Sequence, residues 1–185
     1  MKIPVYKTEG IIIRKFNSNE FDNLLVVYAK EKGKILVKAK SLRKREAKMK
    51  ASLEIFNHVD LLAAKGKNID TITGVAIKNS FPNLRCDLPS LAAAFYISEL
   101  LDKLLAGPEK DERIWQLVWK AFGFLEEKQR SQAIVKKLIN RFEYNLLAYL
   151  GHQPEEKKKS YLDAIQYIAG DKIESQVFLS QVLAV

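Results

Sequence analysis

The chain has 185 residues, of which 48% are hydrophobic and 29% are charged, so it can bury a core and general disorder is excluded. Its length fits one ordinary domain or two small ones and excludes a TIM barrel. The charge is unbalanced, because 31 Lys and Arg residues face 22 Asp and Glu residues and leave a formal net charge of +9.

Five β-strands are expected in the first 80 residues, at 10–16, 24–28, 34–40, 55–63 and 71–78. The third is the clearest, because Ile35, Val37 and Ala39 alternate with lysines, which predicts a half-buried strand with a basic outer side. Short turns connect these segments. The pattern predicts a small closed or partly closed barrel, and the five-stranded oligonucleotide-binding (OB) fold is the best candidate.

After residue 80 the hydrophobic period becomes helical. Asp87 is a suitable N-cap for a helix that ends at Gly107-Pro108, and its apolar residues cover most of its circumference, which predicts a central position. Further helices are expected at 110–127, 131–150, 161–169 and 175–183. We therefore predict an α+β protein with a barrel domain at 1–80 and an all-helical domain at 81–185.

The motifs give little support for catalysis. His58 and His152 lie outside any metal-binding spacing, and no phosphate-binding glycine loop occurs. Cys86 is the only cysteine, so an intramolecular disulfide and a multi-cysteine zinc site are excluded, and a buried structural thiol is expected. No apolar run has the length of a membrane span, and the first residues lack a signal-peptide pattern. We expect a cytoplasmic protein that is not an enzyme and needs no cofactor or metal.

The excess charge is confined to the first part of the chain. Residues 1–80 hold 17 basic and 8 acidic side chains, whereas residues 81–185 hold 14 of each. The cations are densest at 30–50, where ten bases face two acids. A merely solubilising surface is the alternative, but lysines that alternate along a strand and continue into a loop favour nucleic-acid binding. The DNA-binding candidates are Arg14, Lys15, Lys34, Lys38, Lys40, Arg43, Lys44, Arg45, Lys48 and Lys50.

Few aromatic residues accompany these cations. Phe16, Phe21, Tyr28 and Phe56 could stack on bases, but each could equally belong to the core, and Phe56 more so. Contacts are therefore expected mainly with phosphate, which gives binding that tolerates sequence and depends steeply on salt. Leu36, Leu42 and Met49 could be exposed partner contacts near the basic loop.

Several segments resemble a known family. They are Thr8-Glu9-Gly10-Ile11-Ile12-Ile13, the stretch from Ala39-Lys40-Ser41 to Lys50, the helical segment 91–101, and Arg141-Phe142-Glu143 with its following Leu150-Gly151. In this order they resemble RecO, the bacterial recombination mediator, over residues 1 to about 154.

The resemblance implies a repair and recombination protein without catalytic turnover. RecO-like proteins bind single- and double-stranded DNA, anneal complementary strands and, with RecR, help load RecA onto DNA coated by single-strand-binding protein. By position, the barrel and the loop 40–50 would contact the phosphates of DNA in the nucleoid. Arg141 would lie near the pocket that binds the acidic, Phe-ending tail of single-strand-binding protein. An ordinary surface ion pair is the alternative for Arg141.

The sequence also departs from the family pattern. Many members carry a four-cysteine zinc module after the Leu-Gly pair, whereas Gly151-His152-Gln153-Pro154 leads here into a segment without cysteine, and only about 30 residues follow. Contacts of the C-terminal region with partners are therefore in doubt. A generic RNA- or ribosome-binding barrel with a helical extension stays open as the alternative function, since such barrels host many functions.

Overall fold

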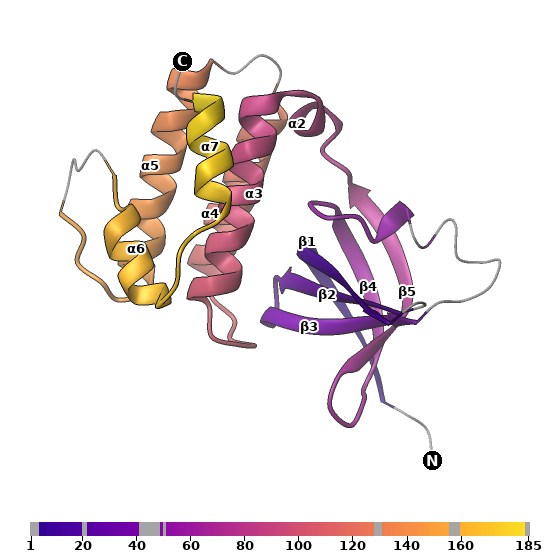
Figure 1. The fold of residues 1–185 in the computed structure, drawn as a ribbon. Coiled ribbons are helices and arrows are strands. Elements are labelled where there is room, and N and C mark those ends of the chain that lie inside the picture. Colours follow the sequence, from indigo (N-terminus) through magenta and orange to yellow (C-terminus); the bar gives the residue numbers. More distant parts are fainter. Residues whose placement is uncertain are drawn as a thin grey trace. The chain divides into compact units, whose positions relative to one another are not determined.

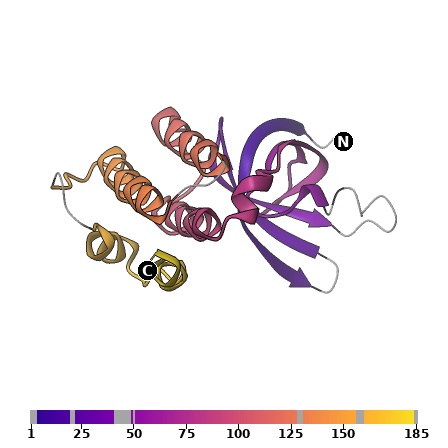
Figure 2. The ribbon, with the colours of Figure 1, turned by 90° about the horizontal axis from the view of Figure 1, so that it is seen from above.

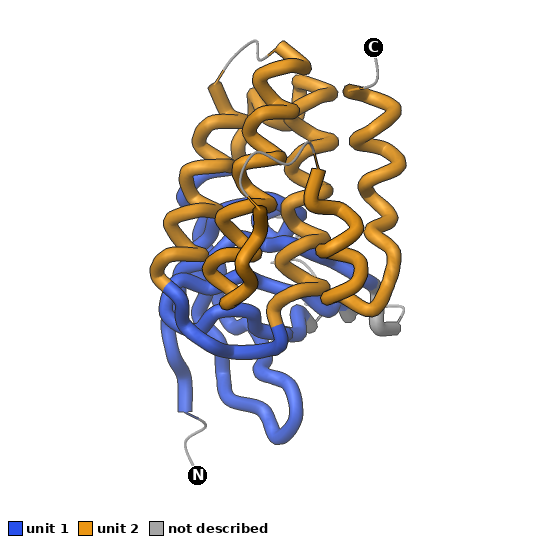
Figure 3. The backbone as a smooth tube through the Cα atoms, turned by 90° about the vertical axis from the view of Figure 1, so that its left-hand side faces the viewer, with its two compact units in different colours: residues 1–80, 106–111 blue, residues 81–105, 112–185 orange. Residues whose placement is uncertain are grey.

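The computed structural model describes residues 4–19, 22–40, 49, 51–127, 131–155 and 160–183. The chain divides into two compact units (Figure 3). The first consists of Met1–Ser80 with Ala106–Asp111, and the second of Phe81–Leu105 with Glu112–Val185.

The first unit is a closed barrel with the strand order β1-β2-β3-β5-β4 (Figure 1). Its strands are β1 Val5–Asn19, β2 Asp22–Ala29, β3 Gly33–Lys40, β4 His58–Ala64 and β5 Asp70–Asn79. Neighbouring strands pair antiparallel, except that β3 and β5 pair parallel and close the barrel. The predicted α+β class with a five-stranded barrel is confirmed.

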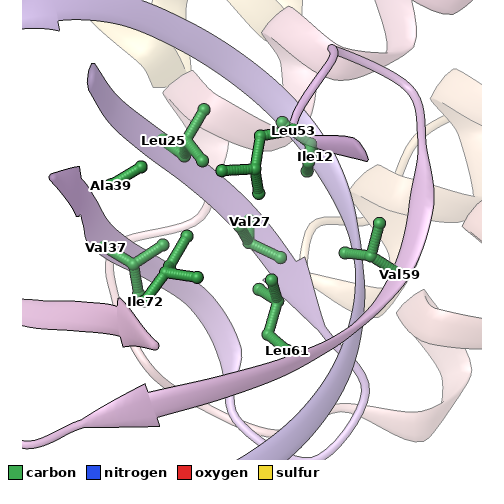
Figure 4. Close-up of a cluster of buried hydrophobic side chains, with 9 residues drawn as sticks. All are labelled: Ile12, Leu25, Val27, Val37, Ala39, Leu53, Val59, Leu61 and Ile72. Carbon is green, nitrogen blue, oxygen red and sulfur yellow. The ribbon is translucent and has the colours of Figure 1, made fainter. Parts of the chain in front are cut away.

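A cluster of aliphatic side chains fills the barrel interior (Figure 4). Alternate residues of each strand point inward, as the period of two requires. On β3, Val37 and Ala39 are buried in this cluster while Leu36 is exposed, so the predicted alternation of this strand is confirmed. The cluster consists of Ile12, Leu25, Val27, Val37, Ala39, Leu53, Val59, Leu61 and Ile72.

Two strands begin three or more residues away from their predicted starts. β1 begins at Val5, well before the predicted start at Gly10, because its first half pairs with β4. β4 begins at His58 and not at Ile55. Phe56 lies just before it with a φ of 71° and a fully buried side chain, and its N–H donates to Ile12 O at 2.7 Å. A left-handed residue cannot continue a strand, so β4 starts after this turn.

The second unit consists of helices. They are α2 Pro82–Cys86, α3 Leu88–Leu104, α4 Glu112–Glu126, α5 Gln132–Tyr149, α6 Leu162–Ala169 and α7 Ser175–Leu183. α3 contacts each of the others, which confirms its predicted central position, and Figure 2 shows α4, α5 and α7 around it. The predicted cap is present, since Ser90 N donates to Asp87 Oδ2 at 3.0 Å.

Three details of the helical part correct the expectations from sequence. The short helix α2 was not predicted, because its capping carboxylate comes from afar: Glu126 accepts hydrogen bonds from the N–H groups of Asn83 and Leu84. Cys86, expected to be buried, is exposed at the end of α2, where Leu84 is the buried residue. α4 begins at Glu112 and not at Lys110, which precedes the helix and pairs with the barrel, its Nζ lying 2.5 Å from Glu31 Oε2.

Within the described residues, no helix combines the length and the apolar character that crossing a membrane requires.

Candidate nucleic-acid interface and helical groove

An irregularity in β1 decides which of its side chains point outward. Ile12 pairs with Val27 and Arg14 with Val26, so Ile13 is an extra residue in the ladder. Such a bulge inverts the alternation of the residues that follow it. Ile12 is in the core, and without the bulge Arg14 and Phe16 would also point inward. With it, both occupy outward positions.

The outward residues of three neighbouring strands form two rows. Because directly paired residues share a side of the sheet, Phe16 of β1 lies beside Leu24 of β2 and Lys38 of β3. Arg14, Val26 and Leu36 form the adjacent row, and Lys34 lies beyond it on β3, opposite the buried Tyr28 of β2. We call this surface the β1–β2–β3 face, and it comprises Arg14, Phe16, Leu24, Val26, Lys34, Leu36 and Lys38.

The β1–β2–β3 face carries three of the predicted DNA-binding cations. Arg14 is exposed, and its guanidinium carbon lies 5.5 Å from the centre of the Phe16 ring. Lys34 and Lys38 are partly exposed on β3, on either side of the exposed Leu36. The structure therefore brings Arg14, Lys34 and Lys38 together on one side of the barrel.

The other predicted cations have different positions. Lys15 lies opposite the core residue Leu25, and its Nζ bonds to Glu54 Oε1 at 2.7 Å. Lys40 ends β3 with its backbone paired to Asp22. Five cations of the basic segment lie outside the described residues: Arg43, Lys44, Arg45, Lys48 and Lys50.

The aromatic and apolar residues considered as contacts differ in their exposure. Tyr28 and Phe56 are buried, Phe16 is 37% exposed, and Phe21 lies outside the described residues. Met49 packs against the barrel core, so it is not the exposed contact that was expected. Leu42 lies outside the described residues.

Carboxylates of the barrel are already matched by cations. Each of the acidic side chains described within residues 4–80 takes part in an ion pair. The hydrogen bond from Lys7 holds the pKa of Asp60 below its ordinary value. The net positive charge of this unit follows from its composition, since residues 1–80 hold 17 basic and 8 acidic side chains. The pairs are Lys7–Asp60, Lys15–Glu54, Lys65–Asp70, Lys78–Glu9 and Lys110–Glu31.

His58 has a structural environment. It is buried at the start of β4, and its Nε2 lies 2.8 Å from Glu9 Oε1. Burial lowers the pKa of His58, although the neighbouring Glu9 acts in the opposite direction. Among the described residues no three His, Cys, Asp or Glu side chains are grouped so that they could hold a metal ion.

A groove of about 720 Å³ lies between α4 and α5 in the helical unit. Its walls combine an apolar floor with a basic rim and one acidic residue, Glu112. The floor includes Leu117, Ala121, Phe124, Leu138 and Phe142, and the rim is formed by Arg113, Lys120, Lys137 and Arg141. We call it the α4–α5 groove.

Arg141 is exposed on the rim of this groove. Its carbonyl accepts a hydrogen bond from Asn145 Nδ2, while no described carboxylate forms an ion pair with its guanidinium. The surface ion pair considered as an alternative is therefore not formed with any described residue. The guanidinium of Arg113 lies 5.2 Å from the Tyr149 ring at the same groove.

The sequence analysis singled out Arg141 but missed its companions on the rim. Their spacing carried a signal. Lys137 and Arg141 are four residues apart on α5, and Arg113 and Lys120 are seven apart on α4, so each pair shares a helix side. That the two basic sides face one groove depends on how α4 and α5 pack, which the spacing alone does not give.

Comparison with known proteins bears on this arrangement. The family model described as "Recombination protein O N terminal" matches residues 1–81, and the one described as "Recombination protein O C terminal" matches residues 85–163. The chain belongs to the RecO family. The two matches fall on the barrel and on the helices from α3 to the start of α6.

Relatives of this RecO-family chain carry the name "DNA repair protein RecO". The protein from Symbiobacterium thermophilum is 32% identical over 150 residues, which are 81% of this chain and 58% of that protein. The one from Dehalococcoides mccartyi (strain 195) is 34% identical over the same shares, and that from Roseiflexus sp. is 30% identical over 84% of this chain and 53% of its own length. The chain thus spans little more than half the length of these relatives.

Proposed function

We propose that this RecO-family chain is a DNA repair protein that binds single- and double-stranded DNA non-specifically through its barrel. The proposal is carried by the grouping of Arg14, Lys34 and Lys38 on the β1–β2–β3 face of a unit in which residues 1–80 hold 17 basic and 8 acidic side chains. Such a surface attracts phosphates whatever the base sequence. The segment 40–50 adds further basic residues to the same unit, and the names of the relatives agree with a repair role.

The helical unit would bind a protein partner. An acidic peptide that ends in phenylalanine matches the α4–α5 groove, because its ring can enter the apolar floor and its carboxylates can meet the basic rim. Arg141 would bind the terminal carboxylate. We therefore assign the C-terminal tail of single-strand-binding protein to this groove.

Together the two surfaces would make the chain a recombination mediator. It would anneal complementary single strands and, with RecR, help load RecA onto DNA coated by single-strand-binding protein, acting in the cytoplasm at the nucleoid. Cations on the barrel reduce the repulsion between two DNA strands, and the groove recruits the coating protein. This role needs no catalytic turnover.

Strand annealing tests this function. Two complementary oligonucleotides coated with single-strand-binding protein, one with a donor dye and one with an acceptor, are mixed with the chain while energy transfer is followed. We expect annealing faster than the spontaneous rate, without ATP and unchanged by a chelator, since phosphate contacts need neither. A rate equal to the protein-free control would contradict the mediator role. A rate abolished by the chelator would contradict the metal-free mechanism.

A further inference from the structure

The centre of the β1–β2–β3 face is apolar, although its edges are basic. Phe16 is 37% exposed and Leu36 is 42% exposed, and the partly buried Leu24 and the buried Val26 lie between them on β2. Arg14 and Lys38 flank these residues in the same two rows. A surface that binds only phosphates needs no apolar centre. Phosphate binding by the cations therefore does not explain why Phe16 and Leu36 are exposed.

Phe16 points outward because of the bulge at Ile13. In a regular ladder, a phenylalanine four residues after the core residue Ile12 would also enter the core, yet the register shift between Ile12 and Arg14 directs it to the surface. The Arg14 guanidinium lies over one face of the Phe16 ring, with its carbon 5.5 Å from the ring centre, so a cation that can bind phosphate is next to the aromatic side chain. Bulges that redirect a side chain are frequent at binding sites.

We propose that the Phe16 ring, flanked by Arg14 and Lys38, is a nucleobase-stacking subsite that makes the β1–β2–β3 face selective for single-stranded DNA. This inference rests on the proposed DNA binding. A base has an apolar face that can stack on Phe16 and contact Leu24 beside it on β2, while the cations of the face hold the phosphates. Because Arg14 and Lys38 are positively charged, we expect this surface to bind a polyanion and not an apolar peptide.

The same geometry disfavours duplex DNA at this subsite. In a duplex the bases are stacked on one another and only their edges are accessible, so the Phe16 ring can contact no base face unless the duplex opens. Duplex binding then uses the cations alone. Single strands gain the stacking contribution in addition to the phosphate contacts.

The test compares three fluorescent ligands of equal length by anisotropy at one salt concentration: oligo-dT, an oligomer of abasic nucleotides and a duplex. The variants are Phe16→Leu, which keeps an apolar side chain, and Phe16→Tyr, which keeps the ring. Because the side chain is exposed, both should fold, and unchanged circular dichroism verifies this. Phe16→Leu should weaken the binding of oligo-dT about tenfold and leave the binding of the abasic oligomer and of the duplex unchanged. Phe16→Tyr should bind all three ligands as the wild type does.

Two results would overturn the subsite. If Phe16→Leu weakens all three ligands equally, the residue supports the barrel and not a base. If it changes none of them while the wild type binds oligo-dT, stacking at Phe16 is wrong and phosphate binding stands. A wild-type chain that binds none of the three ligands overturns the proposed DNA binding and the subsite together.

Discussion

His58, Glu9 and Lys78 form a small polar network in the barrel unit, with His58 buried. His58 Nε2 and Lys78 Nζ lie 2.8 and 3.0 Å from the two oxygens of the Glu9 carboxylate. Burial lowers the pKa of His58, whereas Glu9 raises it and Lys78 lowers it further. Bonds from Lys78 and His58 outweigh the effect of burial on Glu9 and lower its pKa. The folded barrel therefore favours neutral His58 and ionised Glu9.

The pKa of His58 predicts a loss of stability in mild acid. Because its pKa is lowered in the folded state, the stabilising contribution is present above its ordinary value of 6.5 and is lost as the pH falls. The free energy of unfolding of the wild type should therefore fall between pH 7.5 and 5.5. His58→Gln cannot titrate but can still donate to Glu9, so its unfolding free energy should change less over this range, as urea titrations at each pH can measure.

The comparison with the variant isolates this one residue. Glu9 loses its contribution only below its ordinary pKa of 4.5, outside the range measured. Other titrating groups are shared by both proteins and cancel in the difference. Parallel pH profiles of the wild type and His58→Gln would show that the protonation of His58 does not affect folding.

At the scale of elements, the sequence predicted the five strands and the five longer helices because their hydrophobic periods are strong. It did not predict features that depend on distant residues. The bulge at Ile13 inverts the alternation that would place Phe16 inside, and no residue near Ile13 signals it. The turn at Phe56 likewise depends on the backbone of Ile12.

The Arg-Phe-Glu segment shows the same limit in the helical unit. Glu143, which would suit the surface of an amphipathic helix, is buried and accepts a hydrogen bond from Tyr96 Oη at 2.6 Å. Burial raises the pKa of Glu143, although Tyr96 and the N–H of Tyr161 oppose the shift by donating to the carboxylate. The motif therefore joins α5 to α3 through Glu143, while its arginine lies exposed at the α4–α5 groove.

The α4–α5 groove makes a prediction at the scale of its two helices. A labelled peptide with the acidic, Phe-ending sequence of the single-strand-binding protein tail should bind, and Arg141→Ala should weaken it about tenfold, the value of about 1.4 kcal/mol for a charge-assisted bond. Fluorescence anisotropy measures both affinities. Removing the terminal carboxylate from the peptide should weaken binding by a similar factor. Arg141→Ala tested with this shortened peptide should bind little more weakly than either change alone.

Lys136→Ala is the matched control for this experiment. Lys136 is exposed on the same helix but lines a different cavity, with Tyr96 and Glu143, so its loss removes one charge without altering the groove. Equal weakening by Lys136→Ala and Arg141→Ala would indicate a general charge effect. If Arg141→Ala binds the peptide as tightly as the wild type does, Arg141 does not contact the terminal carboxylate of the peptide.

For the whole molecule, the distribution of charge is the central feature. The surplus of nine positive charges lies within residues 1–80, whereas residues 81–185 balance 14 basic against 14 acidic side chains. Arg14, Lys34 and Lys38 of the barrel unit lie on the β1–β2–β3 face. The account therefore requires that this face provides phosphate contacts.

The salt dependence of binding to single-stranded DNA tests this requirement most directly. In the variant Arg14→Glu, Lys34→Glu, Lys38→Glu, affinity should fall and the slope of log K against log salt should become shallower by about 2, at about 0.7 per lost phosphate contact. The control Lys120→Glu, Lys136→Glu, Lys172→Glu changes the net charge equally on the helical unit and should keep the wild-type slope. Equal slopes for both variants would contradict the account, because DNA would then respond to total charge and not to the barrel.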